Sequence, residues 1–542
     1  MKRRSRLSPV VAGALCALLL PSGSGSTRSA KSGGIFRVTF LTMPGSFDYV
    51  DPALAYSRES WALLDTVCAR LMRYRDRPPP LGYQLVPDVA AAPPVVSRDG
   101  TTWTFRLRNG FRFSDGSPVR ADAFAQAIHR TMAPGVDSPA YVYTRAIVGA
   151  EDVHAGRAAR ASGVTARGNR LTVRFTRAVP EFDHWTTMPF FCAVPPALPP
   201  SREGVRTFPG AGPYTIREYR PNERIVLGRN RYYGGRRAHH VDGFHVDLSA
   251  ESPDEKIERV VTGRADWTYA LPAVALQPHL GLIRKYGLNY SRFFVTPGLT
   301  ISMYVLNSSG PLFRNNQQLR RAVNFAVKRE RLLATGAGDA TDQYLPPNVA
   351  GFKQRTIYPR AGDLDHALAL AAGSLRGGKA ILYVPDVPVA RGSAQGVQLQ
   401  LADLGLDIEI RPFGEHATAS SYLGRLGNPE VPWDLALVLW TPDFVDPAAY
   451  INRLLDGQHA GGTNLAHFDE APYNAQMQQA SRLRGAARAK AYAELDLRLA
   501  RDAAPLVPIA VFNEATLVSA RVPTRCMLLR PGLVLTTVCL KP

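Results

Sequence analysis

The hydrophobic and polar positions of this chain follow two different periods along its length. Apolar residues at every second position predict strands over 34–41 and 102–107, because successive side chains of a strand point to opposite faces. Apolar residues at spacings of three and four predict helices over 58–72, 121–132 and 317–333. Strands and helices mix irregularly, so the pattern predicts an α/β or α+β class with several sheets.

Turn residues divide these elements. Asn109-Gly110 and Asp115-Gly116 supply tight turns, and a short strand is predicted between them over 111–113. Further alternation predicts strands from 210 to 233. Trp103 and Phe105 fall on one face of the strand over 102–107, and we interpret both as core residues rather than ligand contacts.

The length of 542 residues exceeds what one hydrophobic core usually holds, so two or three lobes are expected. The net charge of +20 raises the question of a polyanion-binding surface. The arginines are scattered, without a run of five or an aromatic-spaced basic stripe, so we predict no nucleic-acid partner. An anchored interaction protein that uses this charge stays an alternative.

Residues 1–30 are typical of an export signal. A basic start precedes a short apolar stretch over 8–20 and a small-residue tract over 21–26. The apolar stretch is too short to span a bilayer. Cys16 fits a lipid-anchor motif poorly, because Leu15 stands where a small residue is required. We therefore expect an exported protein, soluble after removal of the signal, in the periplasm or at the outer face of the cytoplasmic membrane.

Export leaves four cysteines in an oxidising compartment, where disulfides form. Cys526 and Cys539 close a short loop, so this pair is favoured, which leaves Cys68 with Cys192. Four free buried thiols are the alternative. Their spacing does not match a zinc site.

Catalytic signatures are missing from the sequence, which has no HExxH, GxSxG, GxxxxGK[ST] or strand-linked GxGxxG motif. We predict that the protein is not an enzyme and uses no cofactor. One cluster, His239, His240 and His245, invites a metal. On a strand, His239 and His245 would share one face and His240 would point away. We predict no metal site here, because the family resemblance described below implies an ordinary strand.

Several segments in order along the chain resemble the extracytoplasmic solute-binding proteins of the oligopeptide, dipeptide and nickel importer family (family 5). One of them is Trp440-Thr441-Pro442-Asp443, which follows Trp433-Asp434 and precedes Asp446-Pro447. The resemblance covers nearly the whole mature chain and rests on these segments: 85–90, 99–105, 111–119, 212–214, 230–233, 320–327, 433–434, 440–447 and 504–508.

The resemblance implies an α/β, two-lobed periplasmic-binding-protein-like (type II) fold with an extra inserted domain and a hinge. Lobe I would comprise 31–54, 196–295 and 508–542, the inserted domain 55–195, and lobe II 296–507. The chain would cross between lobes near 295–300 and near 505–508. The Cys68–Cys192 bridge would then join the two ends of the inserted domain.

The resemblance also implies the ligand site. Asp443 would receive the α-ammonium group of a peptide, Trp440 would form a wall of the cleft, and Trp433 would do the same or lie in the core. Thr441 and Phe444 belong to the same predicted binding segment. Backbone groups of residues 46–54 would pair with an extended ligand, and Asp446 is interpreted as a turn residue. Arg425 and His416 are the candidates to meet a peptide carboxylate.

The implied partners are a small peptide and the membrane permease subunits of an ABC importer, with the receptor itself a monomer. The same fold would also suit a receptor for a nickel chelate, haem, a sugar or an opine, or a sensory receptor that is not coupled to transport. These alternatives stay open at the level of the sequence.

Overall fold

The computed structural model describes residues 33–40, 47–249, 252–272, 280–333, 338–414, 419–428, 430–530 and 532–542. The export signal, Cys16 and His416 lie outside these residues. No helix in the described ranges is long and apolar enough to cross a membrane.

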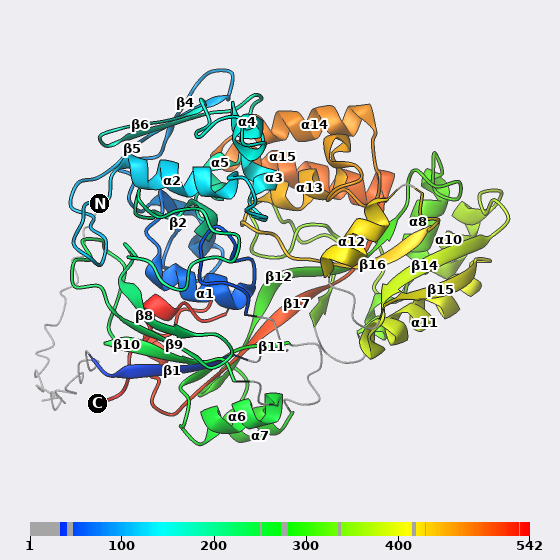
Figure 1. Ribbon diagram of the computed structural model, residues 1–542. Helices are drawn as coiled ribbons and strands as arrows, with labels where there is room; N and C mark the ends of the chain where they lie inside the picture. The colour runs from blue at the N-terminus through cyan, green and yellow to red at the C-terminus, as the bar shows by residue number, and fades with distance from the viewer. Residues whose placement is uncertain are drawn as a thin grey trace, which may run out of the picture.

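One continuous sheet runs through both halves of the molecule, and two long strands form its centre (Figure 1). These are β12 (Phe293–Leu306) and β17 (Leu506–Val518), which pair antiparallel along most of their length. Among the described residues this sheet has eleven strands. On one side of the pair lie β16 (Leu435–Trp440), β14 (Lys379–Pro385) and β15 (Asp407–Phe413); on the other side lie β11 (Trp267–Pro272), β1 (Ile35–Phe40), β10 (Gly243–Asp247), β9 (Arg224–Arg229) and β8 (Tyr214–Arg220), while β13 (Gly338–Ala340) pairs with β17 off this path.

The ladder between β12 and β17 is irregular near its middle, where the register shifts twice. The first shift lies between Pro297 and Ile301, opposite Asn513 and Val511, and the second lies between Ser302 and Met303, opposite Ala510 and Pro508. Proline lacks the N–H that a ladder needs, and a Cβ on Gly298 would lie 2.5 Å from the carbonyl oxygen of Phe512. The first shift falls within residues 297–301, and the second reaches Pro508 on β17, so each irregularity lies near one of the two crossings predicted from the sequence.

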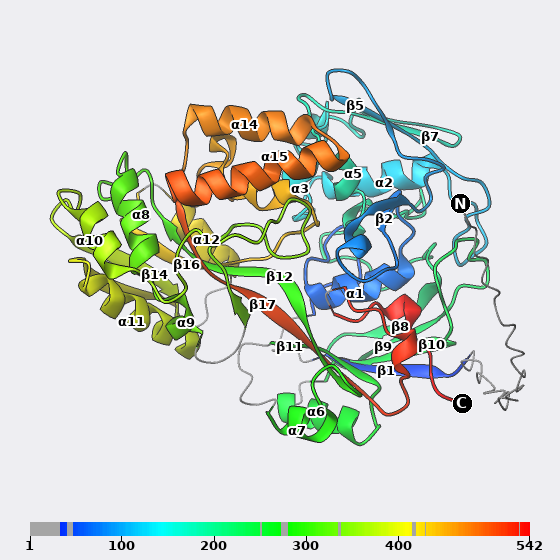
Figure 2. The same cartoon turned by 180° about the vertical axis from the view of Figure 1, so that it is seen from behind.

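Helices cover the sheet on the β14–β15 side. These are α8 (Gln317–Ala326), α10 (Leu364–Ala371) and α11 (Pro388–Ala402), which share an apolar cluster with β14, β16 and β17 (Figure 2). Two helices, α6 (Pro253–Val261) and α7 (Leu280–Tyr286), pack at the opposite end beside β11, β12 and β17.

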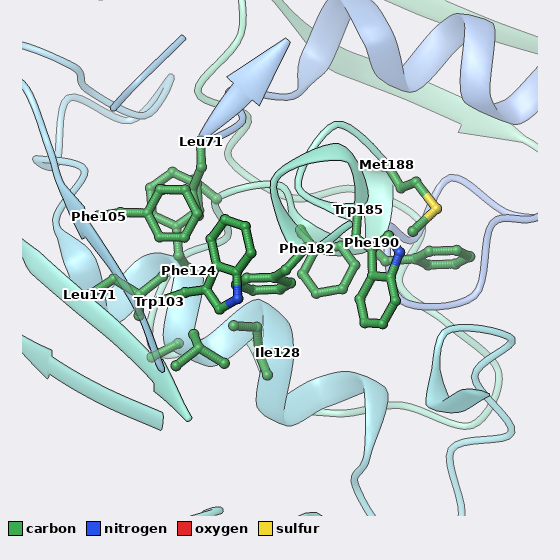
Figure 3. Packing of buried hydrophobic residues seen from close by; sticks show 14 of the residues in the cluster. Leu71, Trp103, Phe105, Phe124, Ile128, Leu171, Phe182, Trp185, Met188 and Phe190 are labelled. Carbon is green, nitrogen blue, oxygen red and sulfur yellow. The ribbon is translucent and has the colours of Figure 1, made fainter. Parts of the chain in front are cut away.

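A separate apolar cluster lies almost wholly within residues 69–193. Its sheet consists of β4 (Val95–Val96), β5 (Thr102–Arg106), β7 (Arg170–Arg174) and β6 (Val164–Arg167), covered by α2 (Ala121–Thr131). Trp103 and Phe105 are fully buried and meet Phe182 edge to face, which confirms their interpretation as core residues (Figure 3). Phe444 and Ala449 enter this cluster from the later half of the chain.

Three predicted elements differ from the structure. Helix α1 (Arg58–Val67) ends earlier than expected, because Cys68 is extended and β2 (Met72–Tyr74) begins soon after. Residues 111–113 make only an isolated bridge between Arg112 and Pro118. The helical pattern over 317–333 covers two helices, α8 and α9 (Arg329–Leu332), because Val327 is extended and the Lys328 N–H donates to the Gln400 side chain.

The four cysteines pair as favoured from the sequence. Cys68, which follows α1, joins Cys192, and Cys526 joins Cys539, with Cα–Cα distances of 5.4 Å and 5.5 Å. The first bond closes the ends of the segment that holds the cluster of Figure 3.

The two disulfides should stabilise the protein unequally. They enclose 124 and 13 residues, so chain entropy assigns about 5 kcal/mol to the first and about 3 kcal/mol to the second. The double substitution Cys68→Ala, Cys192→Ala should therefore lower the melting temperature more than Cys526→Ala, Cys539→Ala. Differential scanning calorimetry of the two variants makes the comparison, and an equal or reversed order would contradict it.

Candidate functional site

Asp443 lies where three segments, distant in the sequence, meet. It follows β16, and its carboxylate accepts hydrogen bonds from two phenols. The Tyr56 hydroxyl, just before α1, donates to Oδ1 at 3.0 Å. The hydroxyl of Tyr143, in α3 (Tyr141–Thr144), donates to Oδ2.

Asp48 sets the position of the first phenol. Its carboxylate accepts the backbone N–H of Tyr56 at 2.6 Å and that of Ser57 at 2.8 Å, and it also accepts the Ser60 hydroxyl at 2.6 Å. These bonds organise the turn into α1. The backbone of residues 47–54 is thus tied into the site through Asp48.

The environment of Asp443 disfavours the ionised form of its carboxyl group. Burial raises the pKa of its carboxyl above the usual range, although the two phenols and the nearby Arg453 act in the opposite direction. Burial, assisted by the negative charge of Asp443, also raises the pKa of Tyr56 and Tyr143, so both phenols stay protonated donors. Among the described residues, no lysine or arginine forms an ion pair with Asp443.

A cavity of about 430 Å³ opens beside this carboxylate. Asp443, Thr441 and Phe444 all line it, together with Tyr56 and Arg58. Arg58 donates to Glu514 of β17 at 2.8 Å and to the Thr300 hydroxyl of β12 at 2.8 Å. Thr300 and Thr441 are joined by a further hydrogen bond of 2.8 Å. The cavity therefore touches the irregular part of the central strand pair.

The two tryptophans predicted for the cleft do not belong to this lining in the described part of the chain. Trp433 is 3% exposed, and its indole N–H donates to the carbonyl of Leu426. Trp433 belongs to an apolar cluster, and Trp440 is partly buried and packs against that cluster. The indole N–H of Trp440 donates to the carbonyl of Ala449 at 2.9 Å. Both indole N–H groups have carbonyl partners inside the fold, and Trp433 is buried, as one of its two interpretations had it. The role of Trp440 as a wall of the cleft stays a prediction.

Asp446 is the turn residue that the sequence predicted, with a further contact. Its carboxylate caps the short helix η4 (Pro447–Ala449) by accepting the Ala448 N–H at 2.8 Å. It also forms a buried ion pair with Arg488 of α15 (Gly485–Arg498) at 2.6 Å. Burial acts to raise the pKa of Asp446, but Arg488 and His184 outweigh it, and the pKa is lowered.

The remaining candidates lie elsewhere. Arg425 is an exposed residue of α12 (Ala419–Gly427) and is not in the cavity lining. His239 and His240 precede β10, and only His245 lies on that strand. Within the described ranges, no group of three or more His, Cys, Asp and Glu side chains is arranged to hold a metal ion.

Comparison with known proteins identifies related sequences. The family model of the bacterial extracellular solute-binding proteins, family 5 Middle, matches residues 84–462. The chain is 23% identical over 430 residues to the probable D,D-dipeptide-binding periplasmic protein DdpA of Escherichia coli, with 76% of each chain covered. It is 24% identical over 456 residues to the periplasmic oligopeptide-binding protein OppA of Salmonella typhimurium, with 80% of each covered.

Solved structures share the fold. The clavulanic acid biosynthesis oligopeptide binding protein 2 superposes with a TM-score of 0.83 at 23% identity, over 94% of this chain and 96% of that one. The unliganded open form of the periplasmic murein tripeptide binding protein MppA gives a TM-score of 0.72 at 22% identity, over 91% and 95%. These likenesses confirm the two-lobed α/β fold predicted from the sequence.

Substitution by asparagine should affect the stability of the ligand-free protein differently at Asp443 and at Asp446. The raised pKa of Asp443 means that folding disfavours its ionised form, so its contribution to stability is lost as the pH rises through that pKa. The lowered pKa of Asp446 means that its contribution is present at neutral pH and lost as the pH falls.

At pH 7 we therefore expect Asp443→Asn to leave the melting temperature unchanged or to raise it. Asp446→Asn should lower it, since breaking a buried pair costs about 3–5 kcal/mol. Thermal melts of the two variants, after ligand has been removed by unfolding and refolding, provide the test. A clear loss of stability in Asp443→Asn would contradict the account of its charge.

Proposed function

Because the chain belongs to the bacterial extracellular solute-binding proteins of family 5, we propose that it is the extracytoplasmic receptor of an ABC importer that binds short peptides. It holds them in the cavity beside Asp443 and delivers them to the permease subunits in the membrane. Relatives named as oligopeptide- and dipeptide-binding periplasmic proteins support this reading. In this proposal the protein is exported, acts as a monomer and catalyses no reaction.

The single observation that carries the peptide assignment is that the Asp443 carboxylate has no ion-pair partner among the described residues. A partly buried charge without such a partner is unfavourable. Two neutral phenols donate hydrogen bonds to it, and Arg453 acts on it only at a distance. The α-ammonium of a peptide supplies both a hydrogen-bond donor and the missing positive charge, and such charge-assisted bonds are the strong ones.

The arrangement of lobes follows from the central strand pair. We propose lobe I from 31–54, 196–295 and 508–542, an inserted domain over 55–195, and lobe II over 296–507. The hinge would be the irregular stretch of β12 between Pro297 and Ile301, together with Val511 to Asn513 opposite it. Tyr56 and Tyr143, which this division assigns to the inserted domain, contact Asp443 of lobe II in the structure, and opening about this stretch would separate them.

Peptides with and without a free amino terminus test the assignment. By isothermal titration calorimetry on ligand-free protein, we expect trialanine to bind, and N-acetylation of trialanine to weaken binding by about 10- to 150-fold, the value of a hydrogen bond to a charged group. Asp443→Asn should bind trialanine with the same loss and should not distinguish the two peptides. Asp403→Asn, at an exposed aspartate after α11, is the matched control and should behave as the parent. Equal binding of both peptides by the parent protein would overturn the role of Asp443.

The affinity for trialanine should also depend on pH. The ammonium binds the ionised carboxylate, and the pKa of Asp443 in the free protein is raised. Affinity should therefore fall on acidification, and at a higher pH than the titration of an exposed aspartate would give. The α-amino group stays protonated in this range, so the change reports the carboxylate. Titrations from pH 7 to pH 4 measure it, and Asp443→Asn should show a flat profile; a flat profile in the parent protein would contradict the prediction.

A further inference from the structure

A second and larger cavity, of about 650 Å³, lies between the inserted domain and the later half of the chain. Its walls come from α3 and from the segment between β7 and α5 (Phe182–Trp185) on one side. On the other side they come from α13 (Ile451–Leu455) and α14 (Ala471–Arg482), which lie beside α3 and α5 in both views of the ribbon (Figures 1 and 2).

Four arginines line this cavity, namely Arg145, Arg177, Arg453 and Arg482. Arg177 donates to the neutral side chain of Gln458 at 3.2 Å, and Arg453 lies over the Tyr143 ring at 4.9 Å. None of the four forms an ion pair with a described residue. The cavity therefore gathers four positive charges, on which the nearby carboxylates Glu181, Asp456 and Asp443 act only at a distance.

The acidic and titratable groups in the lining do not neutralise it. Glu181 is the one acidic residue among the described lining residues, and its carboxylate faces Arg488 at 3.6 Å. His459 also lines the cavity, and burial together with Arg453, Arg177 and Arg145 lowers its pKa to about 3, so it adds no charge at neutral pH. Clustered like charges are unfavourable without a counter-charge, which points to an anion as the occupant.

The arginine-lined cavity adjoins the Asp443 cavity. Phe444 lines both of them, and Tyr143 lines the arginine-lined cavity while its hydroxyl donates to Asp443. Arg453 lies over this same ring, and its charge lowers the pKa of Asp443. A ligand whose ammonium lies on Asp443 thus has a positively charged cavity one aromatic side chain away.

We propose that the arginine-lined cavity binds a carboxylate of the same peptide whose ammonium lies on Asp443, so that the preferred ligands are short acidic peptides. The inference rests on the proposed function. The carboxylate could belong to an acidic side chain near the amino terminus or to the carboxyl terminus of a very short peptide. Arginine suits either source, because its planar group binds carboxylates with two parallel hydrogen bonds.

Matched peptides separate the two sources. The first pair, Ala-Glu-Ala-amide and Ala-Gln-Ala-amide, differs only in a side-chain carboxylate. The second pair, trialanine and trialanine amide, differs only in the terminal carboxylate. By calorimetry at low salt, we expect the parent protein to prefer the acidic member of at least one pair by about 10-fold or more. The preference should shrink in 0.5 M salt, which screens exposed charges.

Substitution of the exposed arginines tests the assignment to this cavity. Arg145→Gln with Arg482→Gln should reduce that preference by about fivefold or more, because half of the lining arginines lose their charge. Both residues are exposed, so the fold does not depend on them. Arg98→Gln, in the exposed turn between β4 and β5, is the matched control and should keep the preference of the parent. Arg453→Met retains an apolar side chain over Tyr143 and should reduce the preference on its own.

The outcomes distinguish this inference from the function on which it rests. If neutral peptides bind through a free amine but no acidic preference exists, or if the preference survives all the arginine substitutions, the arginine-lined cavity is not a carboxylate site while the peptide receptor stands. If no peptide binds the parent protein, both the carboxylate site and the proposed peptide-receptor function are wrong.

Discussion

The pairing of β12 with β17 is the constraint on which the rest of the molecule depends. These two strands bind both halves of the chain into one sheet, and their register shifts twice within one short stretch, between Pro297 and Met303. The Asp443 cavity lies against that place, because Thr300 of β12 and Glu514 of β17 hold Arg58 at its edge. A rotation there would move Asp443 relative to Tyr56 and Tyr143, and it would also move Phe444 and Ala449 relative to the cluster of residues 69–193 that they enter.

Two cavities of opposite character follow from the way in which the inserted domain meets the later half of the chain. One contains a carboxylate that forms no ion pair with a described residue, and the other contains four arginines that form none either. The contacts that surround them are satisfied, since Asp446 pairs with Arg488 and the Val445 N–H donates to the Tyr74 hydroxyl. Some charged residues of the interface thus form ion pairs that hold the halves together, and others form no ion pair with a described residue. The second group is suited to a ligand that carries both a positive and a negative charge.

Much of the fold could be predicted from the sequence, because the alternation at Trp103 and Phe105 and the helical spacing over 121–132 report burial directly. Element ends were harder: the apolar pattern runs on past Val67 and Val327, where extended residues end the helices. Asp443 could be found from its motif. Tyr56, Tyr143 and the four arginines could not, because each comes from a different segment and no spacing links them. The hydrogen bonds of Trp433 and Trp440 could not be predicted either, because the sequence does not show that their indole N–H groups find carbonyl partners within the fold.

The central claim is that a peptide ammonium binds the Asp443 carboxylate, which accepts hydrogen bonds from two neutral phenols in this structure. A crystal structure of the protein with a bound tripeptide tests this most directly. The account predicts the peptide nitrogen at about 2.7–2.9 Å from an Asp443 carboxylate oxygen, as in other charge-assisted bonds. A peptide bound with its amino terminus away from Asp443, and with both phenols still donating to the carboxylate, would contradict it.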